Sequence, residues 1–317
     1  MFDTPWTLGA AGAIEVVAGA VGTTADVIAP SQTLSGATHL PSSTILRFTG
    51  PTTFTPTSVT TLDSSFAIID LLADGTITNG ATFVTNGISD GALRPAARLE
   101  LNHAAVVEAH VINQGTLHIA GAGAGSASIE IYTQNLGADA QFNLLGANAG
   151  TQYDRMNVTN TATLRGSLSL STGAYDPAYL LPHEIVHATG GIMQAFEQVN
   201  GFILSPTKYL AVTYDFDSVF VTAAIPGDAN LDGHVNIADF ATLASNFNGT
   251  GVWTDGSFNG DLAVGIGDFS LLATNFNTSI PASLMRPAQQ YTRPAAVPEA
   301  TTGLVGLLGL IARRGRK

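Results

Sequence analysis

Six oxygen donors follow one another at fixed intervals between residues 228 and 239. Calcium takes about six to eight oxygen ligands, and a calcium-binding loop supplies them from its positions 1, 3, 5, 7, 9 and 12. Gly233 occupies position 6, where such a loop turns sharply and a β-carbon is unfavourable. The spacing therefore predicts a calcium site. Its predicted ligands are Asp228, Asn230, Asp232, the His234 backbone carbonyl, Asn236 and Asp239.

A second loop follows at an offset of 29 residues and retains fewer of these donors. Position 1 lacks a carboxylate, position 6 is Leu262, and Gly265 at position 9 has no side-chain oxygen. Calcium affinity follows the number of charged ligands and the rigidity of the site. We therefore predict that the second site is weaker than the first or empty, and a loop kept for its shape alone stays an alternative. Its candidate ligands are Ser257, Asn259, Asp261, the Ala263 backbone carbonyl and Asp268.

Each loop is followed by the same sequence pattern, because residues 239–248 (DFATLASNFN) match residues 268–277 (DFSLLATNFN). The duplication over residues 227–277 resembles type I dockerins, in which two half EF-hands pack as a pseudo-twofold unit and bind cohesin modules. The resemblance implies calcium as the cofactor and a cohesin-like partner. The positions that carry partner contacts in that family are apolar here, at Ile237-Ala238 and Ile266-Gly267. A hydrophobic partner within the same chain is therefore an open alternative.

One motif upstream fits a zinc protease, because His183-Glu184-Ile185-Val186-His187 has the H-E-x-x-H pattern. That chemistry needs a helix, where histidines four residues apart share a face and reach one zinc ion. Gly190 and Gly191 would end such a helix early. In a strand the two histidines would lie about 13 Å apart at ~3.3 Å per residue, too far for one metal. We expect residues 183–187 to form a strand, and a zinc protease using His183, Glu184 and His187 is a minor alternative.

The region before residue 226 has a composition and a residue pattern that are typical of β-strands. Only 11% of the chain is charged, whereas the outer faces of helices need Lys, Glu and Arg. Apolar and polar residues alternate in segments such as 128–132 (SIEIY) and 163–170 (TLRGSLSL), and Gly-containing turns separate them. Short strands with tight corners favour a β-solenoid over a sandwich or a barrel.

Residues 128–223 also resemble the closing portion of autotransporter-like β-helix repeats of bacterial surface proteins. The resemblance implies a right-handed parallel β-helix, and it lies in the segments YDRMNV (153–158), ATLRGSL (162–168), ATGGI (188–192), FEQVNG (196–201) and YLAVTY (209–214). We predict a mainly β chain with four parts. These are a β-helix-like body over 1–225, a small α-helical dockerin-like calcium module over 226–278, a linker over 279–296 and a hydrophobic sorting tail over 297–317.

The last residues combine a short motif, an apolar run and a basic end. Val297-Pro298-Glu299 precedes the apolar residues 303–312, and Arg313 and Arg314 begin the basic end. A bilayer span usually needs about 20 apolar residues, so this shorter run suits a transient membrane anchor. The order of elements resembles the PEP-CTERM sorting signal handled by exosortases. The resemblance implies export, cleavage near Pro298-Glu299, and delivery to the cell envelope, the cell surface or the extracellular matrix.

Charge and composition bound the function. A formal net charge of -12 removes an electrostatic case for nucleic-acid binding, and the lack of cysteine excludes disulfides and thiol catalysis. Glu15 interrupts the first apolar stretch, so we expect a misplaced or truncated start. We predict a non-enzymatic, exported surface or matrix protein with a structural or binding role. The alternative is a dockerin-bearing carbohydrate-active enzyme, a polysaccharide hydrolase or lyase, whose body would carry a groove of clustered carboxylates.

Overall fold

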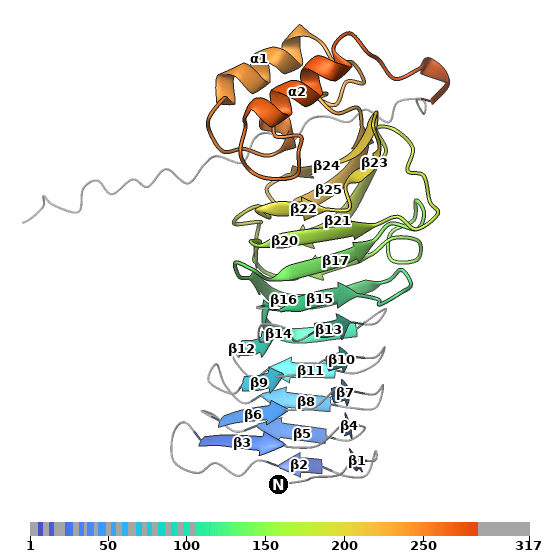
Figure 1. Ribbon diagram of the computed structural model, residues 1–317. Helices are drawn as coiled ribbons and strands as arrows, with labels where there is room; N and C mark the ends of the chain where they lie inside the picture. The colour runs from blue at the N-terminus through green and yellow to red at the C-terminus, as the bar shows by residue number, and fades with distance from the viewer. Residues whose placement is uncertain are drawn as a thin grey trace, which may run out of the picture.

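The computed structural model describes residues 115–284 continuously and, before them, fourteen strands between Trp6 and Asn113. The described chain is mainly β, as the sequence predicts, and two α-helices follow the strands (Figure 1). The sorting tail and residues 285–296 of the predicted linker lie outside the described residues. No helix in the described part is long and apolar enough to cross a bilayer.

Sheet A is a ladder of nine short strands, all paired in parallel with their neighbours. Each strand pairs with one that comes two or three elements later in the chain, so the chain returns to the sheet once per layer. In spatial order the strands are β1 (Trp6–Leu8), β4 (Gln32–Leu34), β7 (Thr52–Phe54), β10 (Gly75–Ile77), β13 (Arg98–Leu101), β15 (Thr116–Ile119), β17 (Asp139–Asn143), β20 (Ser167–Ser171) and β22 (Gln198–Asn200).

Sheet B has sixteen strands and is mixed. Its parallel ladder consists of β2 (Ala13–Glu15), β5 (Ala37–Leu40), β8 (Val59–Leu62), β11 (Thr82–Thr85), β14 (Ala105–Asn113), β16 (Ser126–Gln134), β18 (Arg155–Val158) and β21 (Pro182–Ala188). Five further strands pair in parallel beside this ladder: β3 (Thr23–Val27), β6 (Thr44–Phe48), β9 (Ile68–Leu71), β12 (Asp90–Leu93) and β19 (Ala162–Thr163).

An antiparallel hairpin closes sheet B after β21. Strands β25 (Ser218–Ala224), β24 (Lys208–Tyr214) and β23 (Ile203–Ser205) pair in that order, and β25 is antiparallel to β21. This differs from the wholly parallel solenoid that the sequence predicts. The physical reason is that residues 208–224 form two long strands joined by a short turn, which is an antiparallel connection.

Much of the core of the body comes from alternating buried and partly buried residues along its parallel strands. Along β16 every second residue is buried until a shift in register, and Ile129 and Tyr132 are 1% and 0% exposed. Facing residues from sheet A, such as Leu117 and Phe142, belong to the same buried cluster. Small polar residues on the alternate positions keep the outer faces in contact with solvent.

Buried amides stack at one corner of the body. Gln134 is fully buried and its Nε2 donates to the carbonyls of Arg165 and Ser167, both at 2.7 Å. Asn113 in the preceding layer donates to the Asp139 carbonyl at 3.0 Å. These bonds satisfy backbone groups that the corners remove from the sheets, which is the condition for burying them.

The helical module follows β25 and comprises α1 (Ile237–Asn246), η1 (Trp253–Asp255), α2 (Ile266–Asn275) and η2 (Ala282–Leu284). Asn236 caps α1, and Asn248 and Asn277 have φ of +65° and +62° just beyond α1 and α2, where helices commonly end in the left-handed conformation. In Figure 1 the module lies at the end of the body, beside β24 and β25. Ile280, assigned to the linker, is 3% exposed and its amide donates to the Gly233 carbonyl at 2.9 Å.

Candidate metal site

Asp228, the first residue of the first loop, is buried with its carboxylate directed at the backbone of its own loop. Oδ1 accepts a hydrogen bond from the Asp232 amide at 3.1 Å, and Oδ2 accepts one from the Gly233 amide at 2.9 Å. Gly233 has φ of +84°, a left-handed conformation that glycine adopts without steric cost. The sharp turn at position 6 therefore aims an amide at the carboxylate.

Asp239 ends the loop in the first turn of α1 and is also buried. Its Oδ1 accepts from the amides of Ala229 at 2.9 Å and Asn230 at 3.3 Å, and its Oδ2 accepts from the Asn236 amide at 2.9 Å. Asn236 in turn accepts from the Ala238 amide at 2.8 Å as the helix cap. These bonds draw the start and the end of the loop together.

The other predicted donors lie on the open side of the loop. Asp232 is exposed, and its two oxygens accept from the His234 amide at 2.8 Å and from Asn230 Nδ2 at 3.0 Å. Within the described part of the chain no three His, Cys, Asp or Glu side chains converge as a metal cluster. The structure thus brings Asp228 and Asp239 into the interior and leaves Asp232 at the surface.

The interior of this loop is strongly unfavourable for negative charge. Burial raises the pKa of Asp228 to about 7, and repulsion from Asp239 and Asp232 adds to the effect. Burial also raises the pKa of Asp239, although amide hydrogen bonds oppose the shift. Residues 226–280 contain no Lys or Arg, and no basic residue among those described forms an ion pair with either carboxylate. The loop interior therefore favours a proton or an added cation.

The second loop repeats the hydrogen bonds of the first. The Asp268 carboxylate accepts from the amides of Phe258 at 2.6 Å and Asn259 at 3.1 Å, as Asp239 does from the equivalent amides. Asn259 Nδ2 donates to the Asp261 carboxylate at 2.9 Å, again as in the first loop. The sequence repeat is therefore a repeat of backbone shape as well as of residue type.

Three differences separate the loops. Ser257 replaces the first carboxylate, and its hydroxyl donates to the Asp261 carbonyl at 2.6 Å. Leu262 does not adopt the left-handed conformation of Gly233 at position 6. Gly265 provides no side-chain oxygen at position 9. These differences favour the prediction that the second loop holds calcium weakly or not at all.

Two glycines that sequence reasoning missed fix the loops against the helices. A β-carbon on Gly227 would lie 2.8 Å from the Leu272 Cα of α2, and one on Gly256 would lie 2.8 Å from the Leu243 Cα of α1. The φ angles of the two glycines are +104° and +106°. The glycine before each loop therefore packs closely against the helix of the other repeat. Their shared 29-residue offset is the signal that could have identified them.

The H-E-x-x-H segment lies in β21, so the expectation of a strand is confirmed. His183 is buried with its ring edge-on to Tyr153 at 5.0 Å between centroids, whereas His187 is half-buried and its Nδ1 lies 3.1 Å from Glu184 Oε1. A register shift between Glu184 and Val186 gives the strand this change of face. The two histidines point into different environments and cannot share one zinc ion.

The partly buried side of β21 carries a polar group that the sequence did not indicate. Glu184 forms an ion pair with Arg155 of β18 at 2.7 Å and accepts from the Ser218 hydroxyl of β25 at 2.9 Å. Only sheet pairing brings these three strands together. In a serine triad the two histidine nitrogens contact the acid and the nucleophile separately. Here His187 Nδ1 contacts both Glu184 and Ser218, at 3.1 and 3.2 Å, which is the geometry of a surface network.

No protein-family model matches the chain, and no curated protein matches it. The geometry of the two loops is therefore the basis for a functional interpretation. That geometry consists of one loop with buried, unpaired carboxylates and a second loop of the same shape without the first carboxylate.

Proposed function

We propose that this chain is an exported surface or matrix protein in which the loop over residues 228–239 binds one calcium ion. The observation that carries the proposal is the pair of buried carboxylates, Asp228 and Asp239, in a segment without Lys or Arg. Burying an ion without an opposite charge beside it costs on the order of several kcal/mol, even after the surrounding structure relaxes. A divalent cation between the two ends of the loop offsets that cost and, by binding only the folded loop, stabilises the module.

The donor set fits a hard cation, because every predicted ligand is an oxygen. A carboxylate offers about four lone-pair sites, and Asp228 uses two of them for backbone amides. In this proposal the metal ion binds at the remaining sites. Asp232 completes the set when its exposed side chain turns away from Asn230. Calcium suits this arrangement better than magnesium, which demands near-ideal octahedral geometry.

The parallel part of the body is, in this proposal, a β-helix-like stalk. Consecutive layers of sheet A keep one register, in which Leu117 pairs with Ala140, Ala140 with Leu168, and Leu168 with Val199. Such stacking buries a continuous core between neighbouring layers. The stalk would display the dockerin-like module at its end, and the C-terminal tail would be the signal for exosortase-dependent sorting.

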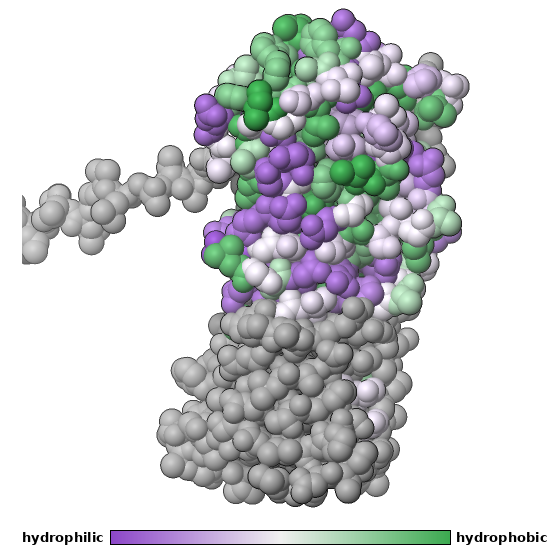
Figure 2. Space-filling view, viewed as in Figure 1, coloured by the Kyte–Doolittle hydropathy of each residue, from purple (hydrophilic) through white to green (hydrophobic). Residues whose placement is uncertain are grey.

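A partner for the module is also part of the proposal. Ile237 and Ile266 occupy position 10 of the two loops and are 67% and 70% exposed. In Figure 2 apolar atoms cover part of the helical end of the molecule, beside polar ones. Two exposed apolar side chains at equivalent positions support a cohesin-like partner that binds this surface through hydrophobic contacts.

Thermal unfolding of the full chain tests the calcium proposal. We expect calcium to raise the melting temperature over that in chelator, since ligand at about 100 times its Kd adds roughly 2.7 kcal/mol to the folded state. Magnesium at the same concentration should do less, and Asp232→Ala should remove most of the gain. Equal melting temperatures in calcium and in chelator would refute the proposal.

A further inference from the structure

The last strand of sheet A does not end in solvent. Strand β22 pairs with β20 on one side, and on the other side the Val199 amide donates to the Gly260 carbonyl at 2.6 Å. Gln198 also forms an antiparallel bridge with Asp261. An uncovered strand edge is a template for pairing with another chain. In this molecule the second loop of the module covers the edge.

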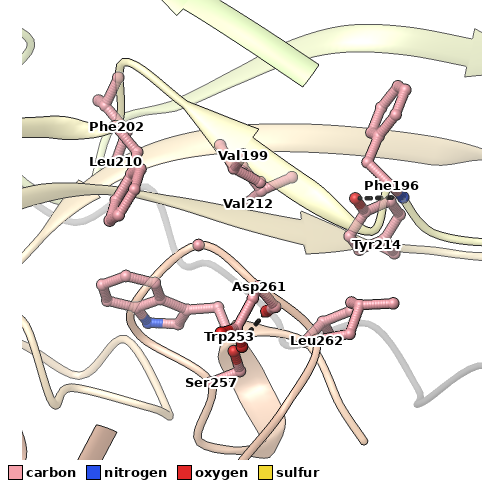
Figure 3. Close-up of a pocket in the computed structure, with 12 residues that line it drawn as sticks. Phe196, Val199, Phe202, Leu210, Val212, Tyr214, Trp253, Ser257, Asp261 and Leu262 are labelled. Carbon is pink, nitrogen blue, oxygen red and sulfur yellow. Dashed lines mark hydrogen bonds between the residues drawn. The ribbon is translucent and has the colours of Figure 1, made fainter. Parts of the chain in front are cut away.

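The hairpin beside this edge is buried on both faces. Leu210 and Val212 of β24 belong to the core of the body, whereas the alternate residues Tyr209 and Ala211 belong to the cluster that contains Trp253. Figure 3 shows Leu210 and Val212 of β24 opposite Ser257 and Asp261 of the second loop across a pocket. Alternate residues of β24 therefore belong to the two core clusters, and the strand packs against both the body and the module.

Gly260 is adapted to this contact rather than to its own backbone conformation. Its φ is +84°, yet the equivalent residue of the first loop, Leu231, holds a left-handed φ of +56° with a full side chain. A β-carbon at position 260 would lie 2.8 Å from the Val199 carbonyl oxygen and 2.6 Å from the Phe202 ring. The Val199 oxygen is backbone and cannot move aside cheaply. The glycine is needed because the body approaches the loop.

We propose that the second loop is a docking loop rather than a cation site, and that the module caps the open end of the body against pairing with a second copy of this chain. The loss of the carboxylate at Ser257 fits this role. The Ser257 hydroxyl instead holds the carbonyl of Asp261, the residue that bridges to Gln198. This docking goes beyond calcium binding at the first loop and does not depend on it.

The variant Gly260→Asn in the full chain tests the docking. Asparagine tolerates left-handed backbone better than most residues, so its effect reports the clash with Val199 more than backbone strain. Gly265→Ala is the matched control, because a β-carbon there meets nothing within 4 Å in the same loop. Hydrogen exchange is measured at the Val199 amide, in calcium and in chelator. In Gly260→Asn we expect the Val199 amide to exchange at least about tenfold faster, because this edge opens locally. Gly265→Ala should leave the exchange rate unchanged.

Sedimentation of the same samples tests the second half of the proposal. Gly260→Asn should form dimers at concentrations where the parent chain and Gly265→Ala do not. If Gly260→Asn does not fold, Gly260→Ala replaces it, because its β-carbon alone would lie 2.8 Å from the Val199 carbonyl oxygen and it leaves the edge of β22 able to pair. Parent-like protection of Val199 in Gly260→Asn, or parent-like sedimentation of whichever of the two variants folds, would overturn the proposal. An effect that is the same with and without calcium separates docking from metal binding.

Discussion

Asp228 and Ser257 occupy the same position in two loops of similar shape, but the Asp228 side chain accepts hydrogen bonds and the Ser257 side chain donates one. The Asp228 carboxylate accepts from the amides of Asp232 and Gly233, whereas the Ser257 hydroxyl donates to the carbonyl of Asp261. The first loop therefore buries two carboxylates, Asp228 and Asp239, whereas the second buries only Asp268. This exchange is the reason for assigning the proposed calcium site to the first loop alone.

Equivalent carboxylates allow a matched test of the two roles. Asp232→Asn removes a charge from the first loop and Asp261→Asn removes one from the same position of the second. We expect Asp232→Asn to weaken calcium binding by about tenfold or more, because calcium affinity depends on ligand charge. Asp261→Asn should leave it within about twofold, since the second loop holds no ion in this account. Equal losses in both variants, measured by calorimetry, would contradict the distinction.

Restoring the missing carboxylate should not restore a second site. Ser257→Asp supplies position 1, but Leu262 still lacks the left-handed turn and Gly265 still lacks an oxygen. We expect one calcium per chain, as in the parent. The melting temperature in chelator should fall, because a carboxylate would be buried beside Asp268 without a partner. A second binding event in the titration would show that the loop shape alone suffices.

A buried carboxylate in the body gives a separate pH test. Asp154 is fully buried, accepts from the amides of Gly125 and Asn143, and has its pKa raised by burial to about 7. The pKa of Asp154 is higher in the folded chain than in the unfolded chain. The stability contributed by its protonated form is therefore fully present below about pH 4 and is lost as the pH rises through 7.

Asp154→Asn cannot titrate and isolates this contribution. The free energy of unfolding of the parent should fall relative to the variant between pH 4 and 7, by roughly 1.4 kcal/mol for each pH unit of the window. Urea unfolding at fixed calcium, at several pH values, measures the difference. Parallel profiles of parent and variant would show that Asp154 has an ordinary pKa in the folded chain.

How far the sequence could predict this molecule differs between its parts. The ligand spacing from Asp228 to Asp239 is local, so it predicts the loop, its turn at Gly233 and the helix that follows. The strand at His183 was predictable because Gly190 and Gly191 exclude a long helix. The antiparallel hairpin was missed because residues 209–214 resemble the β-helix repeats, and strand direction depends on partners distant in sequence.

The contact between the second loop and β22 was also outside the reach of sequence. It joins Val199 to Gly260, and a glycine in an Asp/Asn-rich loop predicts a turn before it predicts a neighbour. Comparison with Leu231 at the equivalent position identifies the glycine as special only once both φ angles are known.

The corner amides provide a test of what stabilises the body. Gln134→Leu leaves the buried carbonyls of Ala138, Arg165 and Ser167 without this donor. We expect a loss of about 1–3 kcal/mol in the free energy of unfolding. Gln141→Leu, at a partly exposed position of β17, should cost clearly less. Similar losses in the two variants, measured by urea unfolding, would argue against the buried corner amides as a main source of stability.

Calorimetric titration of the chelator-treated full chain with calcium tests the central claim most directly. The account predicts one binding event per chain, with proton release near pH 7 as Asp228 ionises, seen as a dependence of the heat on the buffer. Absence of binding heat in two buffers, or an ion held with Asp228→Asn as tightly as in the parent, would contradict it.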